Sequence, residues 1–334
     1  MKNSSVNKYV LSILLLAVIL VCGCGSEAVK DRINPGYEVV DDQGTVVRFE
    51  HKPERIVTSA MGLDGIVLGM LPEEKLAAVS ALADDPVSSN IVEKAQKIKR
   101  KIKNPSAEEV LSLKPDVVFI YNWGKAEVVD NLRELGIKVV VVNGPKSIED
   151  VKNNIILIAK CLHEEAKGVR MIARMDEKLA ELKTKVAQIS PEQRKKVVLI
   201  SLMTSYGGKG CTFDDICQYA GVVNGLSAAG LHNGQSLTKE MLVSINPDVL
   251  IMPVYNDHHT FDIDKYNQEF LEDPALQTLT AVKEKHLFYP REGYIYNSSQ
   301  DIVFGVQEVA RAAYGSLFEQ SGNCHLSVVA EVTK

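Results

Sequence analysis

The side chains best suited to contact a ligand stand where short apolar runs of the sequence end. Trp123, the only tryptophan, follows the apolar run at residues 117–121. A rigid indole there could stack on a planar ligand, or it could pack at an edge of the fold. Ligands of open parallel sheets bind beyond the carboxyl ends of the strands, so residues at such ends are the candidate contacts. They are Met61, Lys101, Lys103, Asn122, Trp123, Tyr206, Tyr255, Arg291 and Tyr294.

Cations gather in one short stretch of a chain that is otherwise acidic. Residues 97–103 contain five lysines and arginines, whereas the whole chain has a formal net charge of −5. Such a run is usually a solvated face. Alternatively, Lys101 and Lys103 point at the ligand with Arg291 opposite them, and the site then favours an anion. An electroneutral ligand would gain little from this arrangement.

Several kinds of chemistry have no support in the sequence. Residues 207–210 resemble a phosphate-binding loop only superficially, because their lysine is followed by glycine and cysteine instead of serine or threonine. There is no recognisable nucleophile with its base, and no pair of carboxylates at catalytic spacing. The seven histidines are scattered or paired in a loop, and no zinc-type spacing occurs. We therefore expect neither an enzyme nor a resident metal or cofactor.

The N-terminus carries an export signal. Residues 1–8 contain two lysines, and the apolar run at residues 9–21 is too short to cross a bilayer, which takes about 20 residues. The small residue Gly23 then precedes Cys24, a pattern that resembles the bacterial lipoprotein signal. We expect lipid on Cys24 and a protein anchored outside the cytoplasm. The alternative is an ordinary secretory signal with incidental cysteines.

Composition indicates a globular protein that does not bind nucleic acid. Hydrophobic residues make up 46% and charged residues 24%, and the acidic balance lacks the basic face that nucleic acid requires. Cys161 lies on the apolar face of a helical stretch, so we expect it to be a buried thiol. Cys211 and Cys217 could form a disulfide in an oxidising compartment, although a helix starting between them would hold them apart.

Short apolar runs alternate with amphipathic helical stretches from Tyr37 onward. Runs without polar alternation, separated by helices, predict parallel strands covered on both faces and hence an α/β fold. Residues 37–47 instead predict a hairpin that turns at Asp42-Gln43-Gly44. The predicted strands are residues 55–59, 76–79, 117–121, 139–143, 197–202, 249–254 and 286–289, and helices include residues 62–69, 107–113, 126–135 and 212–219.

Residues 147–189 form the longest helical stretch. Ser147 with Asp150 is an N-terminal capping pair, and a break near Leu162-His163 divides the stretch into two helices. The second, residues 164–188, would span roughly 37 Å at 1.5 Å per residue. That length suffices to run along two lobes.

An internal repeat links the two halves of the chain. Residues 108–117 align without a gap on residues 240–249, with a glutamate, a serine-apolar pair and Pro-Asp-Val in common. In both places a short helix stops at a proline and leads into an apolar strand. The repeat indicates two equivalent lobes, unless it is merely a common helix-to-strand connector.

Taken with these features, the chain resembles the substrate-binding proteins of iron-siderophore, haem and cobalamin ABC importers. The matching segments, which cover nearly the whole mature chain, are residues 45–46, 52–57, 111–117, 135–139, 221–224, 237–249 and 279–289. The resemblance implies two Rossmann-like lobes with mostly parallel sheets, joined by one long α-helix, with the ligand in the cleft between them. It also implies that Glu108 and Glu240 dock on arginines of an ABC permease dimer that works with a cytoplasmic ATPase. Otherwise these glutamates merely favour helix N-terminal dipoles.

The resulting domain scheme begins with a signal at residues 1–23 and a linker at 24–36. An N-terminal lobe at 37–163, a connecting helix at 164–188 and a C-terminal lobe at 189–318 follow, and the tail at 319–334 has no assigned role. We expect a monomer.

Ligand identity stays open among a few classes. The leading interpretation is an iron complex, either a ferric siderophore or haem, and the alternative is a corrinoid such as cobalamin. An extracytoplasmic sensor on the same fold is a further alternative. If haem iron needed an axial ligand, Tyr206, Tyr255, His258 and His259 would be the candidates, although paired histidines in a polar loop are more often solvated. Free zinc or manganese is disfavoured because several inward-facing ligands would be needed.

Overall fold

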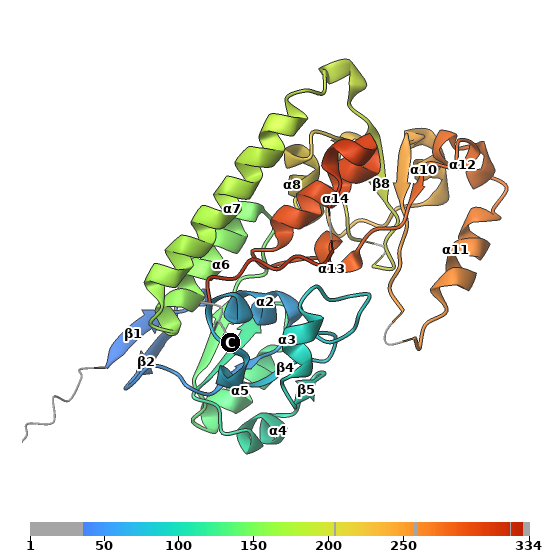
Figure 1. Cartoon of the computed structure of the whole chain (residues 1–334). Coiled ribbons are helices and arrows are strands. Elements are labelled where there is room, and N and C mark those ends of the chain that lie inside the picture. The colour runs from blue at the N-terminus through green and yellow to red at the C-terminus, as the bar shows by residue number, and fades with distance from the viewer. Residues whose placement is uncertain (1–35, 204, 257–258, 321, 330–334) are drawn as a thin grey trace, which may run out of the picture. The chain divides into compact units, whose positions relative to one another are not determined.

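The computed structural model describes residues 36–329 except 204, 257–258 and 321 (Figure 1). The described residues from Tyr37 onward form one compact unit. The predicted signal, its linker up to residue 35 and the lipidation site Cys24 lie outside the described residues, as does His258. Within the described part of the chain, no helix is both long and apolar enough to cross a membrane.

The described part of the chain begins with the predicted antiparallel hairpin. Strand β1 (Tyr37–Val40) pairs with β2 (Val46–Phe49), and the Asp41 carboxylate accepts hydrogen bonds from the backbone N–H groups of Gln43 and Thr45. Gly44 has a φ of 80°, a left-handed conformation that glycine adopts at little cost. The turn therefore forms where the sequence predicted it.

A five-stranded parallel sheet forms the first lobe. Its strand order is β5-β4-β3-β6-β7. Helices α2 and α6 contribute apolar side chains to one face of the sheet and α4 and α5 to the other, as expected for strands that are apolar throughout. The strands are β3 (Ile56–Thr58), β4 (Leu76–Ser80), β5 (Lys101–Ile102), β6 (Val117–Tyr121) and β7 (Val139–Val142), and the helices are α2 (Met61–Met70), η1 (Glu73–Lys75), α3 (Val92–Gln96), α4 (Ala107–Ser112), α5 (Ala126–Glu134) and α6 (Ile148–Cys161).

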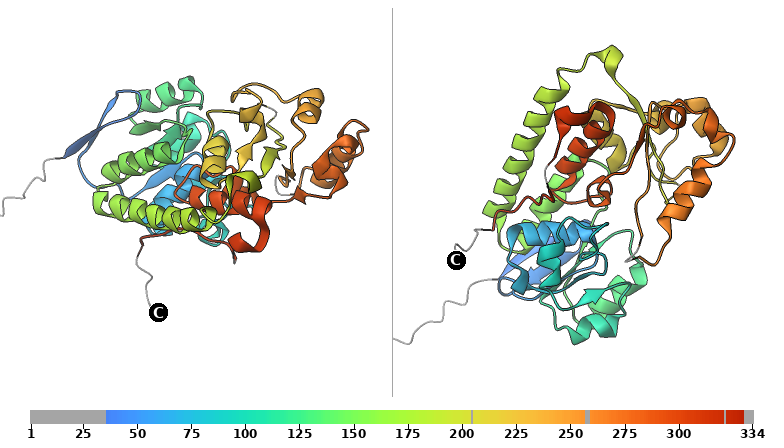
Figure 2. Two further views of the ribbon diagram at one scale, coloured as in Figure 1. Left: turned by 90° about the horizontal axis from the view of Figure 1, so that it is seen from above. Right: turned by 45° about the vertical axis from the view of Figure 1, so that its right-hand side comes forward.

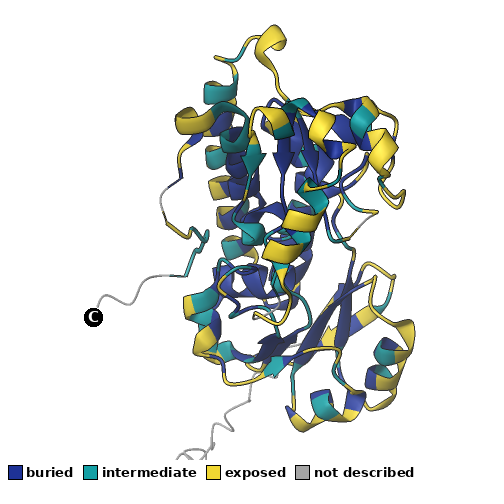
Figure 3. Cartoon of the chain, turned by 90° about the vertical axis from the view of Figure 1, so that its right-hand side faces the viewer, coloured by how far each residue is buried: buried dark blue, intermediate teal, exposed yellow. Residues whose placement is uncertain are grey.

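A four-stranded parallel sheet forms the second lobe, in the order β11-β10-β8-β9. Strands β8 and β10 are shorter than predicted, and Pro253, which lacks an N–H to donate, follows soon after β10. The strands are β8 (Lys196–Leu199), β9 (Val223–Asn224), β10 (Val249–Ile251) and β11 (Leu287–Phe288). The helices are η2 (Pro191–Gln193), α8 (Thr212–Tyr219), α9 (Gly225–Ala228), α10 (Lys239–Ile245), α11 (Ile263–Leu271), η3 (Leu276–Thr278), α12 (Thr280–Lys283), α13 (Glu292–Ile295), α14 (Ile302–Tyr314) and η4 (Gly315–Phe318). Figure 3 shows the buried strands between more exposed helices.

Helix α7 (Glu165–Val186) connects the lobes, as predicted. The hydroxyl of Ser147 caps α6 by accepting from the Asp150 N–H at 3.1 Å, and His163, with a φ of 52°, separates α6 from α7. At 22 residues, α7 is about 33 Å long. It packs on α2 and α6 of the first lobe and on α8 and α14 of the second (Figure 2). The predicted α/β fold of two parallel-sheet lobes joined by one long helix is confirmed.

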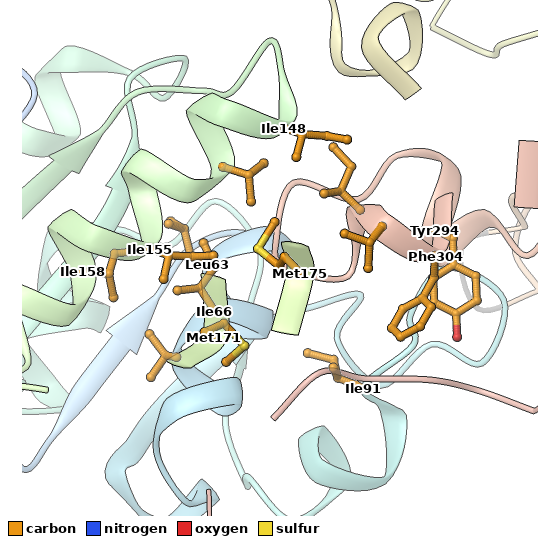
Figure 4. Packing of buried hydrophobic residues seen from close by; sticks show 14 of the residues in the cluster. Leu63, Ile66, Ile91, Ile148, Ile155, Ile158, Met171, Met175, Tyr294 and Phe304 are labelled. Atoms are coloured by element: carbon orange, nitrogen blue, oxygen red, sulfur yellow. The ribbon is translucent and has the colours of Figure 1, made fainter. Parts of the chain in front are cut away.

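The buried face of α7 explains why it stays in place. Met171 and Met175 are fully buried, and they lie among apolar side chains of α2 and α6 (Figure 4). Burying a methionine side chain stabilises a fold by roughly 1.5–3 kcal/mol. The neighbours drawn in Figure 4 include Leu63, Ile66, Ile155 and Ile158.

The cysteines of the described chain form no disulfide. Cys161, Cys211 and Cys217 are buried thiols. Cys211 precedes α8 and donates to the carbonyl oxygen of Gly208, whereas Cys217 lies inside that helix. The alternative of a Cys211–Cys217 bridge is therefore not realised, because the helix begins between the two residues.

Candidate ligand-binding site

The carboxyl ends of the strands in the two lobes meet through the segment at residues 290–301. The Tyr121 hydroxyl, at the end of β6, donates to the Ser298 carbonyl oxygen at 3.1 Å. A Cβ at Gly62 would lie 2.0 Å from the Ser298 hydroxyl oxygen, so α2 requires glycine at this approach. The segment after β11 thus touches the first lobe where β3 and β6 end, which is the edge at which ligands of parallel sheets bind.

Trp123 presents a large open aromatic face at this edge. Its ring centroid lies 4.3 Å from that of Tyr121, and a Cβ at Gly144 would lie 2.0 Å from an indole carbon. The residue is nevertheless 63% exposed. The indole is therefore supported from behind by Tyr121 and Gly144, and much of its surface stays open for stacking.

A second aromatic pair belongs to the other lobe. The rings of Tyr206 and Tyr296 are 5.3 Å apart, and their hydroxyls bond to Thr212 at 2.7 Å and to Ser201 at 2.9 Å. Burial, the largest cause, raises the pKa of both phenols far above the ordinary value. Both stay neutral, so this environment disfavours the phenolate that a tyrosine ligand of iron requires.

A pocket of about 220 Å³ lies between the two lobes. It stands beyond the carboxyl ends of β4, β10 and β11, and the predicted contact residues Arg291 and Tyr294 are among its walls. The volume is below the roughly 300–1,000 Å³ of pockets for drug-sized ligands, so it suits a compact ligand. The lining residues are Pro86, Val87, Ser89, Asn90, Val254, Pro290, Arg291, Gly293, Tyr294 and Asn323.

The three cations proposed for an anion site do not all reach this pocket. Lys101 lies on β5 at the edge of the sheet, where its ammonium pairs with Asp84 at 3.1 Å and donates to the Ile98 carbonyl oxygen. Lys103 follows β5 and is exposed, and of the three only Arg291 is among the lining residues. The two-residue strand β5 was not predicted. It is the outermost strand of the sheet, so Lys101 lies on the edge strand and Lys103 directly after it.

The remaining predicted contacts have varied surroundings. Met61 begins α2 and is partly buried, and Tyr255 is partly buried after β10. The Asn122 side chain donates to the Asn143 side-chain oxygen at 2.7 Å and accepts from the Gly144 N–H at 3.0 Å. Asn122 therefore holds the loop next to Trp123. His259 is exposed, with a φ of 66°.

Two buried carboxyl groups lie near this edge. Desolvation raises the pKa of Asp64, in α2, to about 7 although Ser80 and Thr58 donate hydrogen bonds to it. Burial first, and then the nearby charge of Asp85, raises the pKa of Glu292 to about 8. No cluster of three or more potential metal ligands of the His, Cys, Asp or Glu type occurs in the described chain.

The sequence did not identify several residues of the site. Tyr296, Asn90 and Asn323 are not among the predicted contacts. Asn90 could have been predicted, because it lies in the loop after β4 and ligands of parallel sheets bind beyond the carboxyl ends of the strands. No sequence pattern pointed to Asn323, which comes from the tail.

The two glutamates of the internal repeat occupy matching positions. Glu108 and Glu240 are exposed in the first turns of α4 and α10, whose N-caps are Ser106 and Thr238. The pKa of each glutamate is lowered, first by its own backbone N–H and then by the hydroxyl of the N-cap. Both are therefore charged at neutral pH.

The same two helices also end alike. Lys114 and Asn246, which immediately precede Pro115 and Pro247, have φ values of 49° and 43°. The Asp116 and Asp248 carboxylates then accept backbone N–H groups at the start of β3 and β8, namely Glu54, Arg55 and Lys196. The repeat is therefore a structural one, with the same cap, turn and aspartate clamp in each lobe.

The family model described as periplasmic binding protein matches residues 56–292. The chain belongs to this family. The Bacillus subtilis strain 168 protein named uncharacterized ABC transporter substrate-binding lipoprotein YvrC is 24% identical, and the match covers 92% of this chain and 97% of that protein. This chain is accordingly the substrate-binding protein of an ABC transporter, a family that works with a permease and an ATPase and is generally non-enzymatic.

The relatives that are named after a ligand are named after different ones. The Fe(3+)-citrate-binding protein YfmC of the same Bacillus strain is 21% identical, over 87% of this chain and 89% of that protein. The structure of the molybdate-binding protein MolA of Haemophilus influenzae superposes with a TM-score of 0.68 at 18% identity, covering 84% of this chain and 92% of that one. The structural likeness shows the fold alone.

Proposed function

We propose that the protein is anchored outside the cytoplasm by lipid on Cys24 and delivers a compact, anionic iron complex to its permease, without chemical conversion. The observation that supports this ligand class is the pocket of about 220 Å³ between the lobes, which has Arg291 in its wall. A carboxylate-bearing complex would find a permanent positive charge and the amide side chain of Asn323 there. The ferric citrate relative supports the same class.

Size separates this proposal from the macrocyclic ligands. Haem and corrinoids are drug-sized or larger, so the pocket would have to widen before it enclosed one of them. A corrinoid is the second candidate, and the 63% exposed indole of Trp123 supports it because a planar ring system can stack there. Tyr206 is a poor axial ligand for haem, since its buried hydroxyl is bonded to Thr212.

Calorimetric titration tests the ligand class directly, because Trp123 is not among the residues that line the pocket. Ferric citrate should bind, and Arg291→Gln should raise the dissociation constant at least tenfold, because it removes a charge-assisted contact. Arg291→Lys, which keeps the charge, is the matched control and should lose less. Ferric catecholates, ferric hydroxamates, haem, cobalamin and molybdate complete the panel. Binding of a neutral hydroxamate complex or of cobalamin alone would contradict the proposal.

We also propose that Glu108 and Glu240 are the contacts for the permease. Both carboxylates are exposed and charged, one on each lobe, and neither is required for capping because Ser106 and Thr238 already cap their helices. Glu108→Lys with Glu240→Lys should abolish uptake and leave ligand affinity unchanged. The control is Glu127→Lys with Asp264→Lys, which reverses first-turn carboxylates of α5 and α11 instead. Equal loss of uptake in both double variants would refute specific docking.

The anchor has a simple test of its own. Cys24→Ser should move the protein from the membrane fraction to the soluble one, because a thiol is the acceptor of the lipid. The control Cys22→Ser should leave it in the membrane fraction. Release by Cys22→Ser and not by Cys24→Ser would assign the lipid to the other cysteine.

A further inference from the structure

The tail that the sequence left unassigned crosses from the second lobe to the first. Residues 319–320 and 322–329, here called the strap, follow η4 and are the dark red segment that passes α13 toward α2 (Figure 1). Cys324, Leu326 and Val328 pack against the main apolar core. The strap lies beyond residues 56–292, which the family model matches.

The second lobe holds the beginning of the strap. The Gln307 side chain donates to the Glu319 carbonyl oxygen at 2.8 Å, and the Tyr294 hydroxyl bonds to Cys324. The Arg291 guanidinium donates to the carbonyl oxygens of Gln320 at 3.1 Å and Gly322 at 2.5 Å. These two bonds fix the side chain that lines the pocket.

The first lobe and α7 hold the end of the strap. The Val328 N–H donates to the Gly69 carbonyl oxygen of α2 at 2.7 Å, and the Arg174 side chain of α7 donates to the Ser327 carbonyl oxygen. A Cβ at Gly69 would lie 3.0 Å from the Leu326 carbonyl oxygen, so α2 has a glycine where the strap approaches it.

A fully buried carboxylate joins both lobes and the strap. Asp301, at the N-cap of α14, accepts from the Asn90 side chain of the first lobe and has the His325 Nδ1 of the strap at 2.7 Å from the same oxygen. Its other oxygen accepts the Leu326 N–H at 2.7 Å. The Asn90 side chain also donates to the Cys324 carbonyl oxygen at 2.9 Å. Opening the lobes at this point would expose or orphan a buried charge.

We propose that the strap is a second connection between the lobes, which restrains their opening and positions Arg291 for the ligand. The chain then crosses between the lobes in α7 and again in the strap. Asn323, which lines the pocket, brings the strap into the ligand site. The positioning of Arg291 rests on the proposed function, whereas the restraint of the lobes does not.

Hydrogen exchange of the ligand-free protein tests the restraint. The amides of residues 324, 326 and 328 donate to Tyr294, Asp301 and Gly69, so they should exchange at least about tenfold more slowly than in an unstructured peptide. Val328→Pro removes the N–H that reaches Gly69 and should raise exchange throughout the strap. Val328→Ala keeps that N–H and is the matched control.

A second variant tests the same restraint without a proline, because Val328→Pro could fail to fold. Asn90→Ala deletes the side-chain bonds from the first lobe to Asp301 and to Cys324. Both Val328→Pro and Asn90→Ala should increase the radius of gyration in solution scattering, while Val328→Ala does not. The proposal would be overturned if the strap amides of the wild type exchanged as fast as those of an unstructured peptide. It would also be overturned if neither variant changed the scattering profile or the exchange rates.

Ligand kinetics test the positioning of Arg291. With ferric citrate as probe, Val328→Pro should release the complex about fivefold faster than Val328→Ala, as expected for the loss of one supporting hydrogen bond. Equal release rates would overturn the positioning role. If the wild type does not bind ferric citrate, the proposed ligand class and the positioning role that rests on it both fail, and the exchange and scattering results still decide the restraint.

Discussion

Asp64 should make the stability of this protein depend on pH in an unusual direction. Its carboxyl group is fully buried in α2, and desolvation, which outweighs the hydrogen bonds from Ser80 and Thr58 and the charge of Lys101, raises its pKa from 3.8 to about 7. The unfolded chain loses the proton near pH 3.8, whereas the folded chain keeps it until about pH 7. The stability contributed by this group is therefore complete below pH 3.8 and is lost as the pH rises to 7.

The size of the effect follows from the shift. A difference of roughly three pKa units corresponds to about 4 kcal/mol of unfolding free energy between pH 3.8 and 7. Asp64→Asn removes the titration and can still accept the Ser80 N–H, so its stability should change less over this range. Urea unfolding of both proteins at several pH values measures the difference between the two curves. Parallel curves would refute a buried, neutral Asp64.

Two further substitutions test packing and capping. Gly293→Ala places a Cβ 3.0 Å from the backbone nitrogen of Asn90 in the other lobe. The substitution should therefore lower the unfolding free energy by about 1–3 kcal/mol and increase the radius of gyration in solution scattering. An unchanged scattering profile would contradict this contact. Ser147→Ala removes the hydroxyl that accepts from the Asp150 N–H and should lower the unfolding free energy by about 1 kcal/mol, whereas Ser147→Asn, a good N-cap, should retain most of it. Equal losses in the two Ser147 variants would show that capping is not the cause.

The elements that the sequence predicted best are those with a strong local signal. Residues 117–121 are five consecutive apolar residues between Asp116 and Asn122, and they form β6 with these bounds. The break predicted near Leu162-His163 lies at His163, and Thr212–Tyr219 forms a helix as expected. In each case, neighbouring residues alone carried enough information.

Features that depend on distant partners could not be predicted in this way. Strand β5 has only two residues, Lys101 and Ile102, and exists because it pairs with β4. The strap is short and mixed in polarity, and its position depends on Asp301 and Gly69, which lie far from it in sequence. The pocket likewise joins Asn90 to Arg291 and Asn323, a grouping that only the tertiary structure creates.

The course of the strap affects how the protein should be engineered as a biosensor. A fluorescent domain fused next to the strap would disturb the hydrogen bond from the Val328 N–H to the Gly69 carbonyl oxygen, and it would alter the motion that it was meant to report. The loop between α7 and β8 offers a better insertion point, because residues 190–195 are all exposed. A reporter placed there would leave both crossings between the lobes intact.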